Sequence, residues 1–135
     1  MARLPRLIAI GVPHHITQRG TNREWAFFTD ADREVYLSLP RTSAQQARLR
    51  ILTHCLMSNH VHLVAVPEES GSLAVALRRT RGRYAHWLNV RRGRTGQLWQ
   101  NRYHSCALDS RHTRMALRHV ERNSVRAGLA GQPGA

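Results

Sequence analysis

The sequence has no lysine, few acidic residues, only two cysteines and no long apolar run. Cys55 and Cys106 lie far apart and neither belongs to a Cys-x-x-Cys pair, so no disulfide framework and no zinc knuckle is indicated. No segment approaches the roughly 18 apolar residues that a membrane helix needs, and no small-residue cleavage site follows the first ten residues. We therefore expect a cytoplasmic protein that has no membrane partner.

The scarcity of acidic residues leaves a large positive charge. The chain has 21 basic and 8 acidic residues, which gives a net charge of +13, and every basic residue is an arginine. The planar guanidinium group binds phosphate oxygens two at a time, so this composition favours nucleic acid over an anionic membrane as partner. At 135 residues the chain has room for one domain, which we place at residues 1–130, with a short flexible tail at residues 131–135.

Apolar periodicity and turn signals predict the order strand, helix, strand, strand, helix, strand, helix. The first helix begins at a capping box, Thr29-Asp30-Ala31-Asp32, and we expect Pro40 to break or kink it. This order predicts an α+β fold, with a ferredoxin-like antiparallel sheet, helices on one face and an added C-terminal helix that carries active-site residues. The expected strands are 12–18, 49–57, 60–66 and 97–103, and the expected helices are 29–47, 72–90 and 110–122.

His60 and His62 are the first candidate site residues. Side chains two apart in a strand point to the same side, so the pair presents two imidazoles on one face of the sheet. Two such nitrogens can share one metal ion, although two strand histidines can equally be surface or hydrogen-bonded residues. The chain has no glycine-rich phosphate loop and no Gly-x-Ser-x-Gly elbow, which disfavours nucleotide hydrolysis and acyl transfer.

His119 and Asn123 lie one turn apart on the last expected helix. Imidazole and amide donors together favour magnesium or manganese over a structural zinc ion. On the alternative interpretation, both residues belong to a solvated helix end. The remaining histidines lack ligand spacing, and we assign no role to them: His14, His15, His54, His86, His104 and His112.

Arginines in turns, in a glycine-broken loop and on the second expected helix are candidates for phosphate contacts. They are Arg19, Arg23, Arg79, Arg83, Arg91, Arg92, Arg94 and Arg102. Arg102 also lies between Trp99 and Tyr103. Alternation of aromatic and cationic side chains is typical of surfaces that stack unpaired bases, although aromatics near a strand are more often buried.

Four blocks of the chain resemble, in order, REP-associated tyrosine transposases, a branch of the HUH insertion-sequence transposases. The blocks are Pro13–Gly20, Cys55–Val64, Gly96–Tyr103 and Val120–Leu129. The resemblance implies a nuclease, monomeric or homodimeric, that binds, cleaves and rejoins single-stranded, hairpin-forming DNA in DNA transposition. It also implies a divalent metal, Mg²⁺ or Mn²⁺, held by His60, His62 and Asn123, which polarises the scissile phosphate for attack by a tyrosine.

The sequence departs from this family at the nucleophile. The family's tyrosine lies four residues before the polar helix residue, and this position holds His119. Three alternatives remain open. His119 attacks and forms a phosphohistidine, another tyrosine such as Tyr84 or Tyr103 substitutes, or a catalytically inactive descendant binds DNA without cleaving it.

Overall fold

The structure of this chain is a computed structural model that describes residues 8–100 and 102–126, without the side chains of residues 39–44 and 123–126. None of the described helices is long and apolar enough to cross a membrane. The elements are, in chain order, β1 (His14–Arg19), the 3-10 helix η1 (Thr21–Arg23), α1 (Asp30–Ala47), β2 (Leu49–Met57), β3 (His60–Pro67), α2 (Ser72–Arg92), β4 (His104–Ala107) and α3 (Ser110–Arg126).

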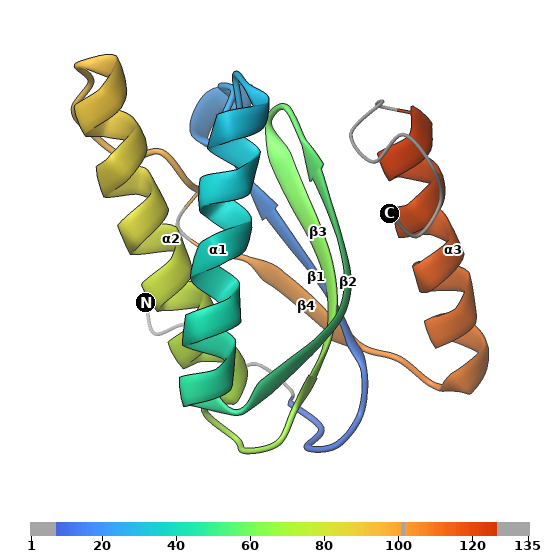
Figure 1. Cartoon of the computed structure of the whole chain (residues 1–135). Coiled ribbons are helices and arrows are strands. Elements are labelled where there is room, and N and C mark those ends of the chain that lie inside the picture. Colours follow the sequence, from blue (N-terminus) through green and yellow to red (C-terminus); the bar gives the residue numbers. More distant parts are fainter. Residues whose placement is uncertain (1–7, 101, 127–135) are drawn as a thin grey trace.

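The four strands form one antiparallel sheet in the order β2-β3-β1-β4 (Figure 1). β1 and β3 are therefore interior strands, hydrogen-bonded on both sides. Because α1 connects β1 to β2 and α2 connects β3 to β4, the chain has the order of a ferredoxin-like fold. The predicted fold class is confirmed.

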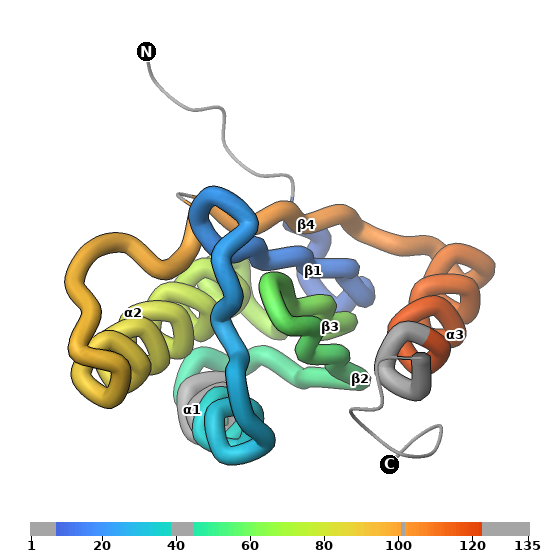
Figure 2. Tube along the Cα trace, turned by 90° about the horizontal axis from the view of Figure 1, so that it is seen from above, coloured from blue at the N-terminus to red at the C-terminus, as the bar shows by residue number. Residues whose placement is uncertain are grey.

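The sheet separates two layers of helix (Figure 2). α1 and α2 cover one face, and α3 covers the other. On the first face, Val61 and Leu63 of β3 belong to the large core beneath α1 and α2. On the second face, Val64 packs with Ala116 and Val120 of α3 in a smaller cluster. Because strand side chains alternate, the even-numbered residues of β3 face α3.

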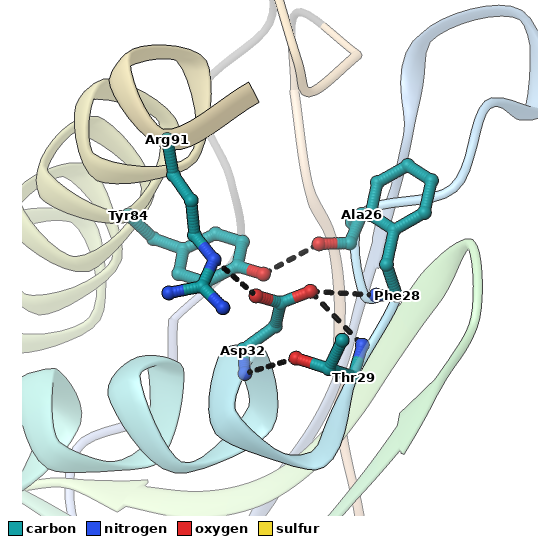
Figure 3. A network of polar contacts seen from close by, with 6 residues as sticks. All are labelled: Ala26, Phe28, Thr29, Asp32, Tyr84 and Arg91. Carbon is teal, nitrogen blue, oxygen red and sulfur yellow. Dashed lines mark hydrogen bonds and ion pairs between the residues drawn. The ribbon is translucent and has the colours of Figure 1, made fainter. Parts of the chain in front are cut away.

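A buried carboxylate fixes the start of α1 (Figure 3). Asp32 Oδ2 accepts hydrogen bonds from the backbone N–H groups of Phe28 and Thr29 at 2.8 and 3.0 Å, and the Asp32 N–H donates to Thr29 Oγ1 at 3.2 Å. This reciprocal arrangement is the predicted capping box. Arg91 of α2 lies 3.8 Å from Asp32 Oδ1, so the same carboxylate connects α1 to α2.

Aromatic rings fill the space between the helices and the sheet. The centroids of Phe27, Tyr36 and Tyr84 lie 5.2 to 5.4 Å apart, and Trp99 lies 6.1 to 6.2 Å from each of them. Such tilted and edge-to-face pairs add to the stabilisation that burial alone gives.

The structure departs from two predicted details of secondary structure. α1 is one helix from Asp30 to Ala47, so Pro40 does not end it. Packing of α1 in the core outweighs the hydrogen bond that a proline removes. The described residues of the range 97–103 do not form the last strand: they make one bridge, between Trp99 and Gly20, and β4 begins only at His104. The Trp99 side chain packs in the aromatic core instead.

A close backbone approach supports the turn between β2 and β3. Ser58 and Asn59 form this two-residue turn, and the Gly20 N–H donates to the Asn59 carbonyl at 2.9 Å. A Cβ atom at Gly20 would collide with the carbonyl oxygen of Glu24. The loop after β1 therefore reaches the turn only with glycine at this position.

We predict that Gly20→Ala lowers the free energy of unfolding by about 1 to 3 kcal/mol, as overpacking typically does. Gly82→Ala is the matched control, because Gly82 lies inside α2 and a Cβ atom there meets nothing within 4 Å. Alanine should raise the stability at that position by about 1 kcal/mol. Urea unfolding of both variants measures the two effects, and similar changes at the two sites would contradict the prediction.

Candidate functional site

β3 brings two histidines to the sheet face that α3 covers. His60 and His62 lie two residues apart in this strand, with ring centroids 4.8 Å apart and ring planes at 84° to each other. The two imidazoles share one face, as the period of the strand predicts.

The orientation of the His60 ring is set by its neighbour in the turn. His60 Nδ1 lies 2.8 Å from Asn59 Oδ1. An amide oxygen only accepts hydrogen bonds, so Nδ1 of His60 carries the proton and donates it. The lone pair of His60 is then on Nε2, the nitrogen that remains available to a ligand.

A third histidine, which sequence reasoning left without a role, comes from β1. His15 Nε2 lies 3.1 Å from His62 Nδ1. β1 and β3 are paired so that His15 is opposite Val64 and Thr17 is opposite His62, which puts His15 on the same face as the pair. The one signal in the sequence was its place in the block Pro13–Gly20.

α3 adds the residue at the expected nucleophile position. The ring of His119 lies 5.9 Å from that of His62, at 89°. His119 is exposed, whereas its neighbour Val120 is buried against the sheet. The structure therefore brings His60, His62 and His119 together from two distant segments. Asn123 follows one turn later on α3, and its side chain lies outside the described residues.

The surroundings keep these imidazoles neutral. Burial is the largest cause of the low pKa of His62, about 4, and nearby His60, His15, His119 and Arg19 contribute in the same direction. Burial, followed by the charge of Arg19, also lowers the pKa of His60. Burial, followed by His119, lowers the pKa of His15. A neutral imidazole keeps a lone pair, which is the form that binds a metal ion.

The pair His60 and His62 could thus supply two nitrogen ligands to a divalent cation. Within residues 8–100 and 102–126, no three or more histidine, cysteine, aspartate and glutamate side chains form a group that could hold a metal ion. A complete site would therefore need a ligand of another kind, such as an amide oxygen or a phosphate oxygen.

A family model described as "Transposase IS200 like" matches residues 11–123, a range that includes every histidine of this cluster. The chain belongs to the IS200-like transposase family. A comparison of this transposase with the curated proteins found no match.

Two solved structures share the fold of this transposase. A REP-associated tyrosine transposase bound to a REP hairpin has a TM-score of 0.76 and 17% identity, over 98% of this chain and 78% of that chain. A putative transposase from Deinococcus radiodurans R1 has a TM-score of 0.53 and 17% identity, over 90% of this chain and 98% of that chain.

Several arginines predicted to contact phosphate have partners within the transposase itself. Arg91 pairs with Asp32 and lies over the Trp87 ring, Arg92 lies 3.8 Å from the centre of the Phe28 ring, and Arg94 pairs with Glu24. Arg79 donates to Gln46 at 3.2 Å. These contacts compete with any phosphate. Of the other predicted residues, Arg19, Arg23 and Arg83 are exposed and Arg102 is half-buried.

α3 carries a row of arginines that the sequence analysis missed. They recur every three or four residues, all four are exposed, and none has an ion pair with another described residue. Spacing of this kind places side chains on one side of a helix, and the row lies beside His119. Its members are Arg111, Arg114, Arg118 and Arg122.

All three tyrosines of the transposase are buried in the core beneath α1 and α2. Tyr36, Tyr84 and Tyr103 are 1%, 0% and 6% exposed. The Tyr84 hydroxyl donates to the carbonyl of Ala26. Burial in this core leaves Tyr84 and Tyr103 unavailable to a phosphate at the histidines, so the structure does not support either as a substitute nucleophile.

The base-stacking surface that we expected at Trp99 and Tyr103 does not form there. Trp99 and Tyr103 are core residues. An exposed aromatic side chain lies instead in the loop between β1 and α1. It is Trp25, which is 53% exposed, and its ring centroid lies 5.9 Å from that of Phe28.

We predict that Tyr84→Phe lowers the free energy of unfolding by about 1 to 3 kcal/mol, because the buried Ala26 carbonyl loses its donor. DNA binding and any covalent adduct with DNA should be unchanged, since the hydroxyl lies in the core. Urea unfolding and a denaturing gel of the DNA reaction measure the two properties. Loss of an adduct from a folded Tyr84→Phe protein would make Tyr84 the nucleophile and contradict this assignment.

Proposed function

We propose that this protein is a metal-dependent DNA transposase that cleaves and rejoins single-stranded DNA beside a hairpin. The observation that carries this proposal is the meeting of His60 and His62 of β3 with His119 of α3, in a chain of the IS200-like transposase family. The net charge of +13 suits a nucleic-acid substrate. A REP hairpin bound to a protein of the same fold supports a hairpin as the recognised form.

His60, His62 and Asn123 are the residues that we assign to the metal ion. Both histidines engage a neighbour through Nδ1, so their Nε2 atoms can serve as ligands. When bound, Mg²⁺ or Mn²⁺ would supply Lewis acidity that polarises the scissile phosphate. Arg19 is opposite His60 in the paired strands, where its charge complements the phosphate.

His119 is the nucleophile that we assign. Its exposed imidazole would use a nitrogen lone pair to form an N–P bond with the scissile phosphate, while the bond from phosphorus to the leaving nucleoside oxygen breaks. The leaving oxygen takes up a proton from solvent. Attack by the hydroxyl group of a second strand end on the phosphohistidine would form the new P–O bond and break the N–P bond. The hydroxyl proton would pass to solvent and the lone pair would return to His119, which joins the strands.

A second function, DNA binding without cleavage, is favoured by two observations. All three tyrosines are buried, and the family's nucleophile position holds His119. A protein of this kind would keep the fold and the basic surface of a transposase but would lack the strand-cleaving step.

A denaturing gel of the protein with labelled, hairpin-flanked single-stranded DNA and Mn²⁺ tests the first function. We expect a covalent adduct that acid destroys, because an N–P bond is acid-labile whereas a phosphotyrosine is not. His119→Ala should abolish the adduct, and His60→Ala or EDTA should lower its yield by orders of magnitude.

His119→Tyr separates the two functions. If the wild-type protein forms no adduct but His119→Tyr forms an acid-stable one, the site is intact and the natural protein binds without cleaving. Absence of an adduct from both proteins, despite tight DNA binding, would contradict the catalytic proposal. His119→Phe is the matched control, because it adds an aromatic ring without a nucleophile.

The exposed arginines of α3 lead us to predict how the DNA-binding constant depends on salt concentration. Arg118→Gln should reduce the slope of the logarithm of the binding constant against the logarithm of salt concentration by about 0.7, the value for one phosphate contact on single-stranded DNA. Arg94→Gln removes the same charge from a residue that is paired with Glu24, and it should leave the slope nearly unchanged. Fluorescence anisotropy titrations at several salt concentrations measure both slopes, and equal effects would contradict the assignment.

A further inference from the structure

The contact between His15 and His62 has the geometry of an in-plane hydrogen bond. The two ring planes differ by only 13°, and the centroids are 5.3 Å apart while Nε2 of His15 and Nδ1 of His62 are 3.1 Å apart. The difference between these two distances is about the sum of the two ring radii, so both nitrogens lie close to the line between the ring centres. The N–H of one ring therefore points at the lone pair of the other.

The direction of this hydrogen bond follows from the role assigned to His62. If Nε2 of His62 is the metal ligand, its proton must be on Nδ1, and His15 Nε2 must accept it. His60 has the same arrangement, with Asn59 Oδ1 as the acceptor at 2.8 Å. Each histidine of the pair thus has one acceptor at Nδ1, supplied by β1 in one case and by the turn in the other.

We propose that His15 is a positioning residue that holds His62 in the tautomer with its lone pair on Nε2 and fixes the direction of that lone pair. The proposal rests on the function proposed above and assigns a role to a residue that does not itself contact metal or DNA.

Burial makes this role hard to replace. His62 is only 8% exposed, so water has little access to its Nδ1 when His15 is removed. β1 is an interior strand, paired with β3 and β4 through His14, His15, Ile16 and Thr17. His15 is therefore held on a rigid part of the sheet, as a residue that orients a ligand must be.

Long-range ¹H–¹⁵N NMR spectra of the imidazoles in the metal-free protein test the proposal directly. We expect His62 Nδ1 to be protonated and Nε2 to carry the lone pair. His15→Phe should convert His62 to a mixture of tautomers, and His15→Gln should restore the original one, because its amide oxygen can accept the same proton. The control is His86→Phe, which removes an exposed histidine from α2 on the other side of the sheet.

Calorimetric titration with Mn²⁺ alone gives the second readout. His15→Phe should weaken Mn²⁺ binding about 10- to 100-fold, the usual effect of losing such a partner, and His15→Gln should recover most of it. His86→Phe should bind like the wild-type protein. A role of His15 in packing alone would leave the His62 tautomer unchanged in both His15 variants.

The outcomes separate this proposal from the proposed function. If His62 of the wild-type protein carries its proton on Nε2, or if His15→Phe leaves the His62 tautomer and Mn²⁺ binding unchanged, the role of His15 is wrong. The wild-type spectrum decides the first point even if His15→Phe does not fold. If the tautomer is as expected but Mn²⁺ does not bind the wild-type protein, the metal-dependent function fails while the hydrogen bond stands.

Discussion

β3 is an interior strand that pairs with β2 along its length and with β1 from His60 to Ala65, so its side chains must alternate between the two faces of the sheet. Val61 and Leu63 thereby enter the core beneath α1 and α2, and His60 and His62 face α3. A shift by one residue would bury both imidazoles in the core and expose the apolar residues. The hydrophobic effect that fixes the register of this strand therefore also places the histidines.

The two faces of the sheet also differ in how their arginines are paired. Only eight acidic residues accompany 21 arginines, and two of them, Glu24 and Asp32, pair with Arg94 and Arg91 near the end of α2. The arginines on the exposed side of α3 have no such ion pair among the described residues. Part of the positive charge without internal compensation therefore lies on α3, the helix that carries His119, where a phosphate would benefit from it.

Local patterns in the sequence predicted the fold class, the capping box at Asp32 and the shared face of the histidine pair. What they could not predict depends on contacts between distant segments. His15 acquires a partner 47 residues away only because β1 and β3 pair in one register. The alternation of side chains around Trp99 resembles that of a strand, yet its ring packs among aromatic residues of other elements. The loop residue Arg94 likewise pairs with Glu24, a partner that no spacing rule indicates.

α3 is attached to the sheet by small side chains. Among the described side chains of α3, those up to Arg122, Ala116 and Val120 pack against Cys55 and Val64, with Leu117 and Met57 at the edge. The large core of the molecule lies on the other side of the sheet. An element with so little buried apolar area is the first to detach in local opening reactions. We therefore expect the helix that carries His119 to open before the core does, so that the spacing between His119 and the histidine pair can change without unfolding the rest of the protein.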